Sequence, residues 1–404
     1  MRPLPRRASA FFAALALVLP VSLLLAPAPA QSDTRGTGVA RKIIGRGVLL
    51  ALPPIVQSGT SPSAPPSTGQ VVATFEPARP GRPVLLERWS GGKWRQVARK
   101  RQDSWGSASF PAPAGTYRSR TLTDRDGDVL TGRVVTRDWT PAFEDTFSGT
   151  SVDATVWSDQ RREHESVYAP RTCTRTDPAA RRVEGGVLHL GIALDPARLD
   201  QRCHYTTDAG AGEQAFLLTS QIATEQTRLF RHGIAAARMK PQQAKGMHSS
   251  FWLLPEATKF TDGDPSAGTE IDVMEFFGEA PNGRETIGSF VSYYEPGWQN
   301  VQYGGMFREA RQALGDGARW WDEFHVFSVE WTPREYIFRV DGREYHRETN
   351  AVSQAQQYLV LSMLASDHEL AELTADELDD TAQVDWVRVY DAESTTATRS
   401  TRAR

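Results

Sequence analysis

Short apolar stretches separated by turn residues recur along most of the chain. Between 70 and 138 they are rich in Val, Leu, Thr and aromatic residues, and pairs such as Pro80-Gly81 and Gly91-Gly92 separate them. Short strands with turn signals about every 8–12 residues are typical of β-sandwiches. The pattern therefore predicts a small β module over residues 70–138.

The strand pattern continues from Phe143 onward. Only 306–314 and 369–378 depart from it clearly, and we expect surface helices or loops there. Many short strands bounded by turns favour two packed sheets, because each strand must bury its apolar face against another layer. We therefore expect an all-β protein with a second, larger β-sandwich over 139–391.

The N-terminus has the pattern of a signal peptide over residues 1–30. Arg2, Arg6 and Arg7 precede an apolar stretch, and Ala28-Pro-Ala30 provides a cleavage site made of small residues. A basic start, a short apolar region and such a site direct a chain to secretion. We therefore expect the mature protein to be secreted and extracellular.

Two further segments lack the pattern of the β regions. Residues 31–69 end in a Pro-, Ser- and Gly-rich run typical of flexible linkers, although they also contain a short apolar run over 48–56. Residues 392–404 are rich in Ser, Thr and Arg, which predicts a disordered tail. These boundaries predict that residues 140–391 fold without the N-terminal module.

The overall charge excludes some classes of partner. Charged residues make up 24% of the chain, and the formal net charge is −3. This balance favours neither nucleic acid nor an acidic membrane surface as a partner.

For the oligomeric state, we expect a monomer.

The chain has two cysteines, Cys173 and Cys203. An exported protein meets an oxidising environment, so one disulfide between them is expected, and two unpaired buried thiols are the alternative. A zinc site needs about four ligands, and no nearby histidine stands at ligand spacing from this pair.

Three carboxylates stand among apolar residues in Glu270-Ile-Asp-Val-Met-Glu275. On a strand, Glu270 and Asp272 face the same way, whereas Glu275 would face the other way. One extra residue, a β-bulge around Val273-Met274, would return Glu275 to the first face. Carboxylates this close cannot all ionise easily, so one is expected to hold a proton near neutral pH. A carboxylate beside a carboxylic acid suits a retaining glycosidase, and a solvated acidic strand face is the alternative.

The stretch resembles the active-site strand of glycoside hydrolase family 16 in its bulged, laminarinase-like form, Glu-x-Asp-x-x-Glu. Other motifs of that family recur in the same order along the chain. They are Phe143-Glu-Asp-Thr-Phe147, Gly186-Val-Leu188, Arg238-Met-Lys240, Phe251-Trp-Leu-Leu-Pro255, Glu330-Trp-Thr-Pro333, Val340-Asp-Gly342 and Val384-Asp-Trp-Val-Arg-Val-Tyr390. The resemblance implies a concanavalin-like β-jelly-roll sandwich with an open sugar-binding cleft. The module before it resembles a small immunoglobulin-like β-sandwich and is either a spacer or a carbohydrate-binding module.

By this resemblance Glu270 is the nucleophile, Glu275 is the general acid/base, and Asp272 is the carboxylate that tunes the pair. The implied function is that of a secreted, endo-acting, retaining β-glycanase. Its implied substrate is a β-1,3 or mixed β-1,3/1,4-glucan polysaccharide, and catalysis needs no cofactor. The alternatives are a β-galactanase of the agarose or carrageenan type, a transglycosylase, and a non-catalytic glucan-binding protein.

Aromatic side chains near the acids are candidates for sugar binding, because sugar rings present apolar faces. Tyr293 and Trp298 stand in a turn-rich stretch and are expected to line the cleft. Trp252 and Trp331 stand in apolar strand patterns, which favours a supporting place in the core or below the cleft. His248 stands where laminarinase-like relatives usually carry tryptophan; it is either a hydrogen-bonding group of the cleft or a structural histidine.

Many members of the family bind a structural calcium ion. Asp385 matches the usual carboxylate ligand, and Gly186 matches a ligand that binds through its backbone carbonyl. Calcium takes about six to eight oxygen ligands, so these two residues do not complete a site. Asp385 as an ordinary surface acid is the alternative.

Overall fold

The computed structural model describes most of the chain after the N-terminal segment. The described residues are 46–60, 62–122, 127–160, 170–208, 210–255, 263–280, 285–297, 299–314, 317–391 and 399–403. The predicted signal peptide therefore lies outside the described residues, as do 31–45 of the predicted linker. Within the described part, no helix is long and apolar enough to cross a membrane.

The fold is all-β, as predicted. The described residues hold one short α-helix, α1 (Asp367–Leu370), together with short 3₁₀ turns in the regions where the strand pattern lapsed and before two strands. These turns are η1 (Pro178–Ala180), η3 (Pro265–Ala267), η4 (Glu309–Ala313) and η5 (Ala375–Glu377).

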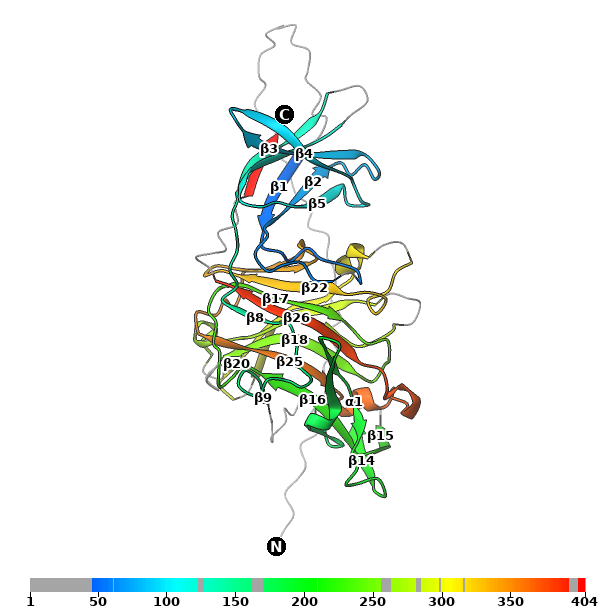
Figure 1. The fold of residues 1–404 in the computed structure, drawn as a ribbon. Helices are drawn as coiled ribbons and strands as arrows, with labels where there is room; N and C mark the ends of the chain where they lie inside the picture. Colours follow the sequence, from blue (N-terminus) through cyan, green and yellow to red (C-terminus); the bar gives the residue numbers. More distant parts are fainter. Residues whose placement is uncertain are drawn as a thin grey trace, which may run out of the picture. The chain divides into compact units, whose positions relative to one another are not determined.

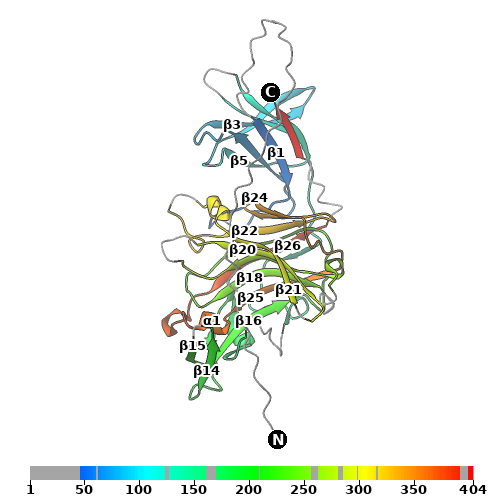
Figure 2. The same cartoon turned by 180° about the vertical axis from the view of Figure 1, so that it is seen from behind.

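Two large sheets carry the C-terminal part of the chain, and we call them the front sheet and the back sheet. The front sheet has nine strands. In order they are β10 (Thr174–Thr176), β16 (Leu217–Ala223), β25 (Gln357–Leu364), β18 (His248–Pro255), β19 (Glu270–Phe276), β20 (Ile287–Glu295) and β21 (Gln299–Phe307), with β9 (Ser158–Asp159) and β13 (Ala193–Leu194) on β16. Figure 2 labels β16, β18, β20, β21 and β25 of this sheet.

The back sheet has eight strands. They are β11 (Arg181–Glu184), β12 (Val187–Leu190), β26 (Ala382–Tyr390), β17 (Gly233–Lys240), β22 (His325–Trp331), β23 (Tyr336–Val340) and β24 (Arg343–Glu348), with β8 (Phe143–Asp145) on β26. Figure 1 shows its strands β17, β22 and β26 in one layer and β18 and β25 of the front sheet in the next.

One hydrophobic core fills the space between the front and back sheets. Front-sheet residues such as Phe251 and Met274 share it with back-sheet residues such as Val329 and Phe338, and all four are at most 1% exposed. Successive strand residues face opposite sides, so each strand gives alternate residues to this core. The expected two-sheet sandwich is therefore present.

The N-terminal part forms an eight-stranded sheet of its own. Its strands are β4 (Lys93–Arg101), β3 (Pro83–Ser90), β6 (Gly115–Thr121), β7 (Val129–Thr136), β1 (Arg46–Leu52), β2 (Gln70–Glu76) and β5 (Ser107–Pro111), with β27 (Arg399–Ala403) on β1. It has a separate core that includes Leu49, Val71, Phe110 and Val134. The predicted β module is therefore present.

Two predicted boundaries need correction. Strand β1 falls in the predicted linker and uses the apolar run over 48–56, which pairs with β2 because alternate residues of the run can be buried. Strand β27 falls in the predicted disordered tail, yet residues 399–403 pair with β1. Residues 43–404 form one compact unit.

The remainder of the predicted linker lies against the back sheet. Buried Arg238 donates to the Gln57 carbonyl at 3.2 Å and also bonds the Gly59 carbonyl, while buried Arg388 donates to the Ala64 carbonyl at 3.0 Å. The segment supplies acceptors that buried guanidinium groups require. Its composition resembles that of a flexible linker, but its carbonyls have fixed partners.

The predicted disulfide between Cys173 and Cys203 is present. Cys203 lies on β14 (Arg202–Thr207), which forms a separate hairpin with β15 (Gly210–Ala215). Thr172, beside Cys173, donates to the buried Asp367 carboxylate of α1 through its N–H at 2.7 Å and its hydroxyl at 2.6 Å. The bridge therefore lies next to the only described α-helix of the chain.

Candidate active site

Strand β19, which carries the three acids, lies inside the front sheet between β18 and β20. Glu270 pairs with Ser292 and Asp272 with Phe290, both on β20. Residues that are partners across antiparallel strands have side chains on the same face of the sheet. The strand is therefore held by neighbours on both sides, which fixes where its side chains point.

The register of β19 shifts where the bulge was predicted. Both neighbouring ladders are irregular there: the shift against β20 lies between Asp272 and Glu275, and the shift against β18 leaves Val273 without a partner. Val273 and Met274 follow each other, yet both are 0% exposed and belong to the core between the sheets. Two consecutive inward residues bring Glu275 onto the face of Glu270 and Asp272. We call this face of the front sheet the acid face.

The bulge has dedicated hydrogen-bond donors. A bulge removes a backbone carbonyl from the ladder, and a buried carbonyl needs a donor. Ser289 Oγ donates to the Val273 carbonyl at 2.9 Å, and the Tyr345 hydroxyl, from the back sheet, lies 3.3 Å from the same carbonyl and 2.6 Å from Ser289 Oγ. Burial raises the pKa of Tyr345, so the hydroxyl remains a donor at every physiological pH.

A glycine leaves room beside Glu275. Gly288 is the β20 partner of Glu275, and a Cβ atom placed on it would lie 3.1 Å from the Glu275 Cβ and 3.0 Å from Met306 Sδ. These distances are shorter than ordinary van der Waals contact between such atoms. The position therefore keeps space for the Glu275 side chain.

His248 is the closest ionic neighbour of Glu275 among the described contacts. Its Nε2 lies 3.0 Å from Glu275 Oε1 and 2.9 Å from Ser250 Oγ, and its ring stacks on Phe277 with centroids 4.2 Å apart. Burial alone would lower the pKa of His248, but the Glu275 and Glu369 carboxylates outweigh it and raise the pKa. His248 therefore belongs to the electrostatic environment of the acids.

Residues 199–388, which include β19 and His248, match the family described as Glycosyl hydrolases family 16. We call residues 199–388 the family 16 region. The family 16 region contains the predicted acids and the bulge between them.

The relatives of the family 16 region are distant. A glucan endo-1,3-beta-glucosidase A1 from Niallia circulans is 23% identical over 285 residues, which cover 61% of this chain and 37% of that protein. A beta-glucanase from Fibrobacter succinogenes is 28% identical over 165 residues, which cover 40% of this chain and 43% of that protein. The chain thus spans about two fifths of the length of the curated relatives it matches.

Solved structures also resemble the chain. The X-ray structure of an endo-beta-1,3-glucanase from Pyrococcus furiosus has 21% identity and a TM-score of 0.46, and the match covers 66% of this chain and 96% of that one.

The aromatic residues predicted to bind sugar are only partly brought to the acid face. Trp252 is the β18 partner of Asp272 and therefore shares its face, where it is 7% exposed and donates to Ser362 Oγ at 3.1 Å. Its place agrees with the expected support below the cleft. Trp298 lies outside the described residues.

The prediction for Tyr293 needs correction, whereas the core position expected for Trp331 is confirmed. Ser292 pairs with Glu270 and faces the acids, so Tyr293 faces the opposite side of β20, and the half-buried Tyr294 shares the acid face instead. Trp331 lies on the back sheet, where it is 3% exposed in the core and donates to the Ser353 carbonyl at 3.0 Å. Local composition shows neither which face of β20 Tyr293 occupies nor which of the two sheets contains Trp331.

The predicted calcium ligands have other contacts. Asp385 Oδ2 lies 2.6 Å from Arg238 Nη1, while Gly186 lies in the turn between β11 and β12 with a φ of 78°. Across the described residues, no group of three or more His, Cys, Asp or Glu side chains could hold a metal ion. The donor set is too small for the oxygen shell of calcium, so we derive no role for the metal.

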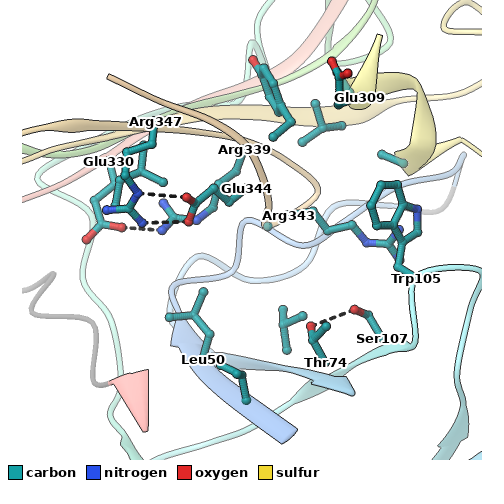
Figure 3. A pocket seen from close by; sticks show the side chains of 18 of the residues that line it. Leu50, Thr74, Trp105, Ser107, Glu309, Glu330, Arg339, Arg343, Glu344 and Arg347 are labelled. Carbon is teal, nitrogen blue, oxygen red and sulfur yellow. Dashed lines mark hydrogen bonds and ion pairs between the residues drawn. The ribbon is translucent and has the colours of Figure 1, made fainter. Parts of the chain in front are cut away.

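A pocket of about 490 Å³ lies away from the acid face and is lined by residues of β1, β2, β23, β24 and η4 (Figure 3). Several of its charged groups pair with one another: Arg339 lies 2.7 Å from Glu330, and Arg347 lies 2.8 Å from Glu344. None of the three predicted acids lines it. Mutual pairing of its charges gives this pocket a structural explanation, so the acid face remains the candidate active site.

Several residues of the site were not predicted from the sequence. Ser289 and Tyr345 support the bulge, Gly288 leaves room for Glu275, and Glu369 approaches His248 from α1. Only Gly288, a glycine inside a strand pattern, carried a local signal of close approach. The others come from distant segments that meet only in the folded sheet.

Proposed function

We propose that this protein is an endo-acting, retaining β-glycanase that hydrolyses a β-1,3 or mixed β-1,3/1,4-glucan by double displacement. The observation that carries the proposal is the bulge at Val273, which places Glu270, Asp272 and Glu275 on one face of the front sheet. A retaining mechanism needs two carboxyl groups about 5–5.5 Å apart. Glu270 and Glu275 lie on either side of Asp272 on this face, so their side chains must lean toward each other along the strand to reach that distance.

The roles follow from the chemistry of double displacement. The Glu270 carboxylate attacks the anomeric carbon while Glu275 gives its proton to the departing glycosidic oxygen. Glu275, now ionised, takes a proton from water, whose oxygen attacks the same carbon and releases Glu270. Asp272, which is 5% exposed, lies between them on the strand. Its carboxyl group influences which of the two glutamates holds a proton.

The names of the relatives support a glucan as substrate. The Niallia circulans protein is a glucan endo-1,3-beta-glucosidase, and the Fibrobacter succinogenes protein is a beta-glucanase. The substrate is proposed as a β-glucan on this ground, with a galactan of the agarose or carrageenan type as the alternative substrate and transglycosylation as an alternative outcome of the same intermediate.

A non-catalytic glucan-binding protein is the second candidate. One relative, 25% identical over 132 residues, is Gram-negative bacteria-binding protein 3 of Drosophila melanogaster, whose name describes binding. Binding alone does not need two carboxylates placed for attack and proton transfer, whereas the bulged strand supplies both. The complete set of acids favours the enzyme.

Cleavage of a small polysaccharide panel tests the proposal. We expect laminarin or lichenan to release reducing ends while agarose, carrageenan and xyloglucan do not. Proton NMR early in the reaction should show the β-anomer first, since two inversions restore the starting configuration. Initial α-anomer would assign a single displacement instead, and binding without release of reducing ends would favour the binding protein.

We further propose that the protein is secreted as a monomer and that its N-terminal β module is immunoglobulin-like. The disulfide between Cys173 and Cys203 supports export, because such bridges persist in oxidising compartments. Mass spectrometry of the mature protein from culture medium tests export directly. An N-terminus at residue 1 would argue against cleavage after Ala30.

A further inference from the structure

His248 connects Glu275 to a second carboxylate on a different element. Its Nε2 lies 3.0 Å from Glu275 Oε1, and its Nδ1 lies 3.5 Å from Glu369 Oε1. The three side chains come from β19, β18 and α1, so they are far apart in the sequence. One imidazole ring thus lies between two carboxylates, with one ring nitrogen toward each.

Glu369 is held firmly in this position. It is 8% exposed, and its second oxygen accepts a hydrogen bond from the Ser366 N–H in a capping box at the start of α1. Asp367 of the same helix accepts two hydrogen bonds from Thr172. The carboxylate that faces His248 is therefore fixed by its helix.

Among the described residues, Ser250, Phe277 and Arg171 also act on His248. Ser250 Oγ shares Nε2 with Glu275 at 2.9 Å, Phe277 stacks on the ring, and Arg171 acts on it electrostatically from outside β18. His368 lies 3.8 Å from Glu369 Oε1, but its side chain is 57% exposed. The two carboxylates are the closest charges to the imidazole, and water reaches the pair poorly because the His248 and Glu275 side chains are only 12% and 18% exposed.

We propose that Glu275, His248 and Glu369 form a proton-sharing relay that supplies and restores the proton of the catalytic acid, with His248 and Glu369 as positioning residues. The proposal rests on the proposed function of Glu275. It extends that function to two residues outside the three-acid strand, His248 on β18 and Glu369 on α1.

The proton count is conserved through the cycle. Before cleavage, one proton is shared between Glu275 Oε1 and His248 Nε2, while the negative Glu369 stabilises it on the imidazole. When Glu275 gives this proton to the leaving oxygen, Glu275 is left ionised and His248 neutral. Water then returns one proton to the pair as it attacks the glycosyl-enzyme, and the relay is restored.

Histidine NMR tests the relay without substrate. The chain has eight histidines, and the His248→Gln variant identifies the signal of His248 in protein labelled at histidine Cε1. We expect Glu275→Gln and Glu369→Gln each to lower the titration midpoint of His248, since each removes a negative charge. Gln can keep the capping box of α1, so Glu369→Gln removes the charge without removing the cap. His368→Gln, on the same helix, is the matched control and should leave the midpoint unchanged.

The pH dependence of kcat/KM provides the second measurement. In Glu369→Gln, the alkaline limb of the kcat/KM profile should move to lower pH by on the order of one pH unit, because the shared proton is held less tightly. His248→Gln should also move this limb, and adding Glu369→Gln to it should move the limb no further. A purely structural role would lower kcat at every pH and leave the limb in place.

The outcomes separate the relay from the proposed function. An unchanged His248 midpoint in both Gln variants overturns the relay, even where Glu275→Gln is inactive and the hydrolase assignment stands. A wild-type protein that cleaves no glycan overturns the proposed function, whereas the NMR titration still decides whether the three groups share a proton. A shifted midpoint together with a shifted alkaline limb supports both.

Discussion

The acid face of the front sheet and the outer face of the back sheet both carry buried charge, but they arrange it differently. On the back sheet, Arg238 pairs with Asp385 at 2.6 Å, and Arg388 pairs with Glu144 at 2.8 Å. The backbone carbonyls of Gln57, Gly59 and Ala64 also accept hydrogen bonds from these two arginines. There each buried cation has an anion and further acceptors.

On the acid face, carboxylates gather instead. Glu270, Asp272 and Glu275 share one strand face, and Glu369 approaches the same histidine as Glu275. Balanced charges secure a fold, whereas an accumulation of like charges costs stability and persists where chemistry needs it. The difference teaches that the two regions are distinguished by how their charges are grouped: arginine–carboxylate pairs on the back sheet, and several carboxylates around one strand and one histidine on the acid face.

The largest expected effect comes from Glu270→Gln. We expect kcat to fall by roughly a factor of a thousand or more, since no nucleophile remains, while the melting temperature stays the same or rises as one like charge disappears. Azide should restore part of the turnover and give an α-configured glycosyl azide. Reducing-end assays and thermal melts measure both. Near wild-type hydrolysis by this variant would remove Glu270 from the mechanism.

Arg238→Met should show the opposite profile. The change removes the partner of Asp385 and the donor to two carbonyls, so the free energy of unfolding should fall by roughly 3–5 kcal/mol. Turnover at moderate temperature should be preserved. Arg182→Met is the matched control, because Arg182 is 55% exposed in its pair with Glu184 and should change stability by less than about 0.5 kcal/mol. Equal melting temperatures for the two variants would contradict the expected difference between the buried and the exposed arginine pair.

Reduction of the disulfide should destabilise the protein by about 3–4 kcal/mol in the chain-entropy model, for its sequence separation of 30. We expect turnover at moderate temperature to persist, since neither cysteine lies on the acid face. Thermal melts with and without reductant measure the change, and Cys173→Ser with Cys203→Ser is the control for reductant effects. Alkylation of both thiols in unreduced, unfolded protein would contradict the bridge.

Tyr345→Phe tests the support of the bulge. Removing the hydroxyl leaves Ser289 as the described side-chain donor to the Val273 carbonyl, so we expect a loss of about 1 kcal/mol. Because Glu275 depends on the bulge for its position, kcat should fall more than KM rises. Tyr303→Phe, on β21, serves as the comparison. A fully active, fully stable Tyr345→Phe variant would show that Ser289 alone holds the bulge.

The smallest effect concerns pH and stability. The pKa of His248 is raised in the folded protein, so protonation stabilises the fold. This contribution is complete below the unfolded pKa of about 6.5 and disappears as pH rises through the raised folded value. Denaturant melts between pH 5 and 9 should therefore show a decline on the alkaline side that His248→Gln lacks. An identical slope in both proteins would mean that the histidine does not titrate in this window.

The sequence predicts those features that depend on local order. The spacing of Glu270, Asp272 and Glu275 predicts the bulge, because alternation along a strand leaves one residue to be accommodated. The motifs of the family 16 region predict the sandwich, and the single pair of cysteines predicts the bridge. Each is a property of neighbouring residues or of a unique pair.

Features that depend on distant partners could not be predicted. The Pro-rich run over 57–69 looks like a free linker until its carbonyls meet Arg238 and Arg388 on the back sheet. The side of Tyr293 follows from the pairing of Ser292 with Glu270, which composition does not reveal. Likewise, Glu369 meets His248 only because α1 and β18 come together in the folded chain.

The bulge at Val273 also has a genetic consequence. Loss of that single codon would leave Glu-Ile-Asp-Met-Glu, in which simple alternation again puts all three acids on one face and keeps the following phenylalanine in the core. The last glutamate would only move about one residue step, roughly 3.3 Å, along the strand. A strand with or without this residue therefore keeps the same apolar residues in the core and the same three acids on the other face of the sheet. What the extra codon changes is the spacing between Asp272 and Glu275 along the strand.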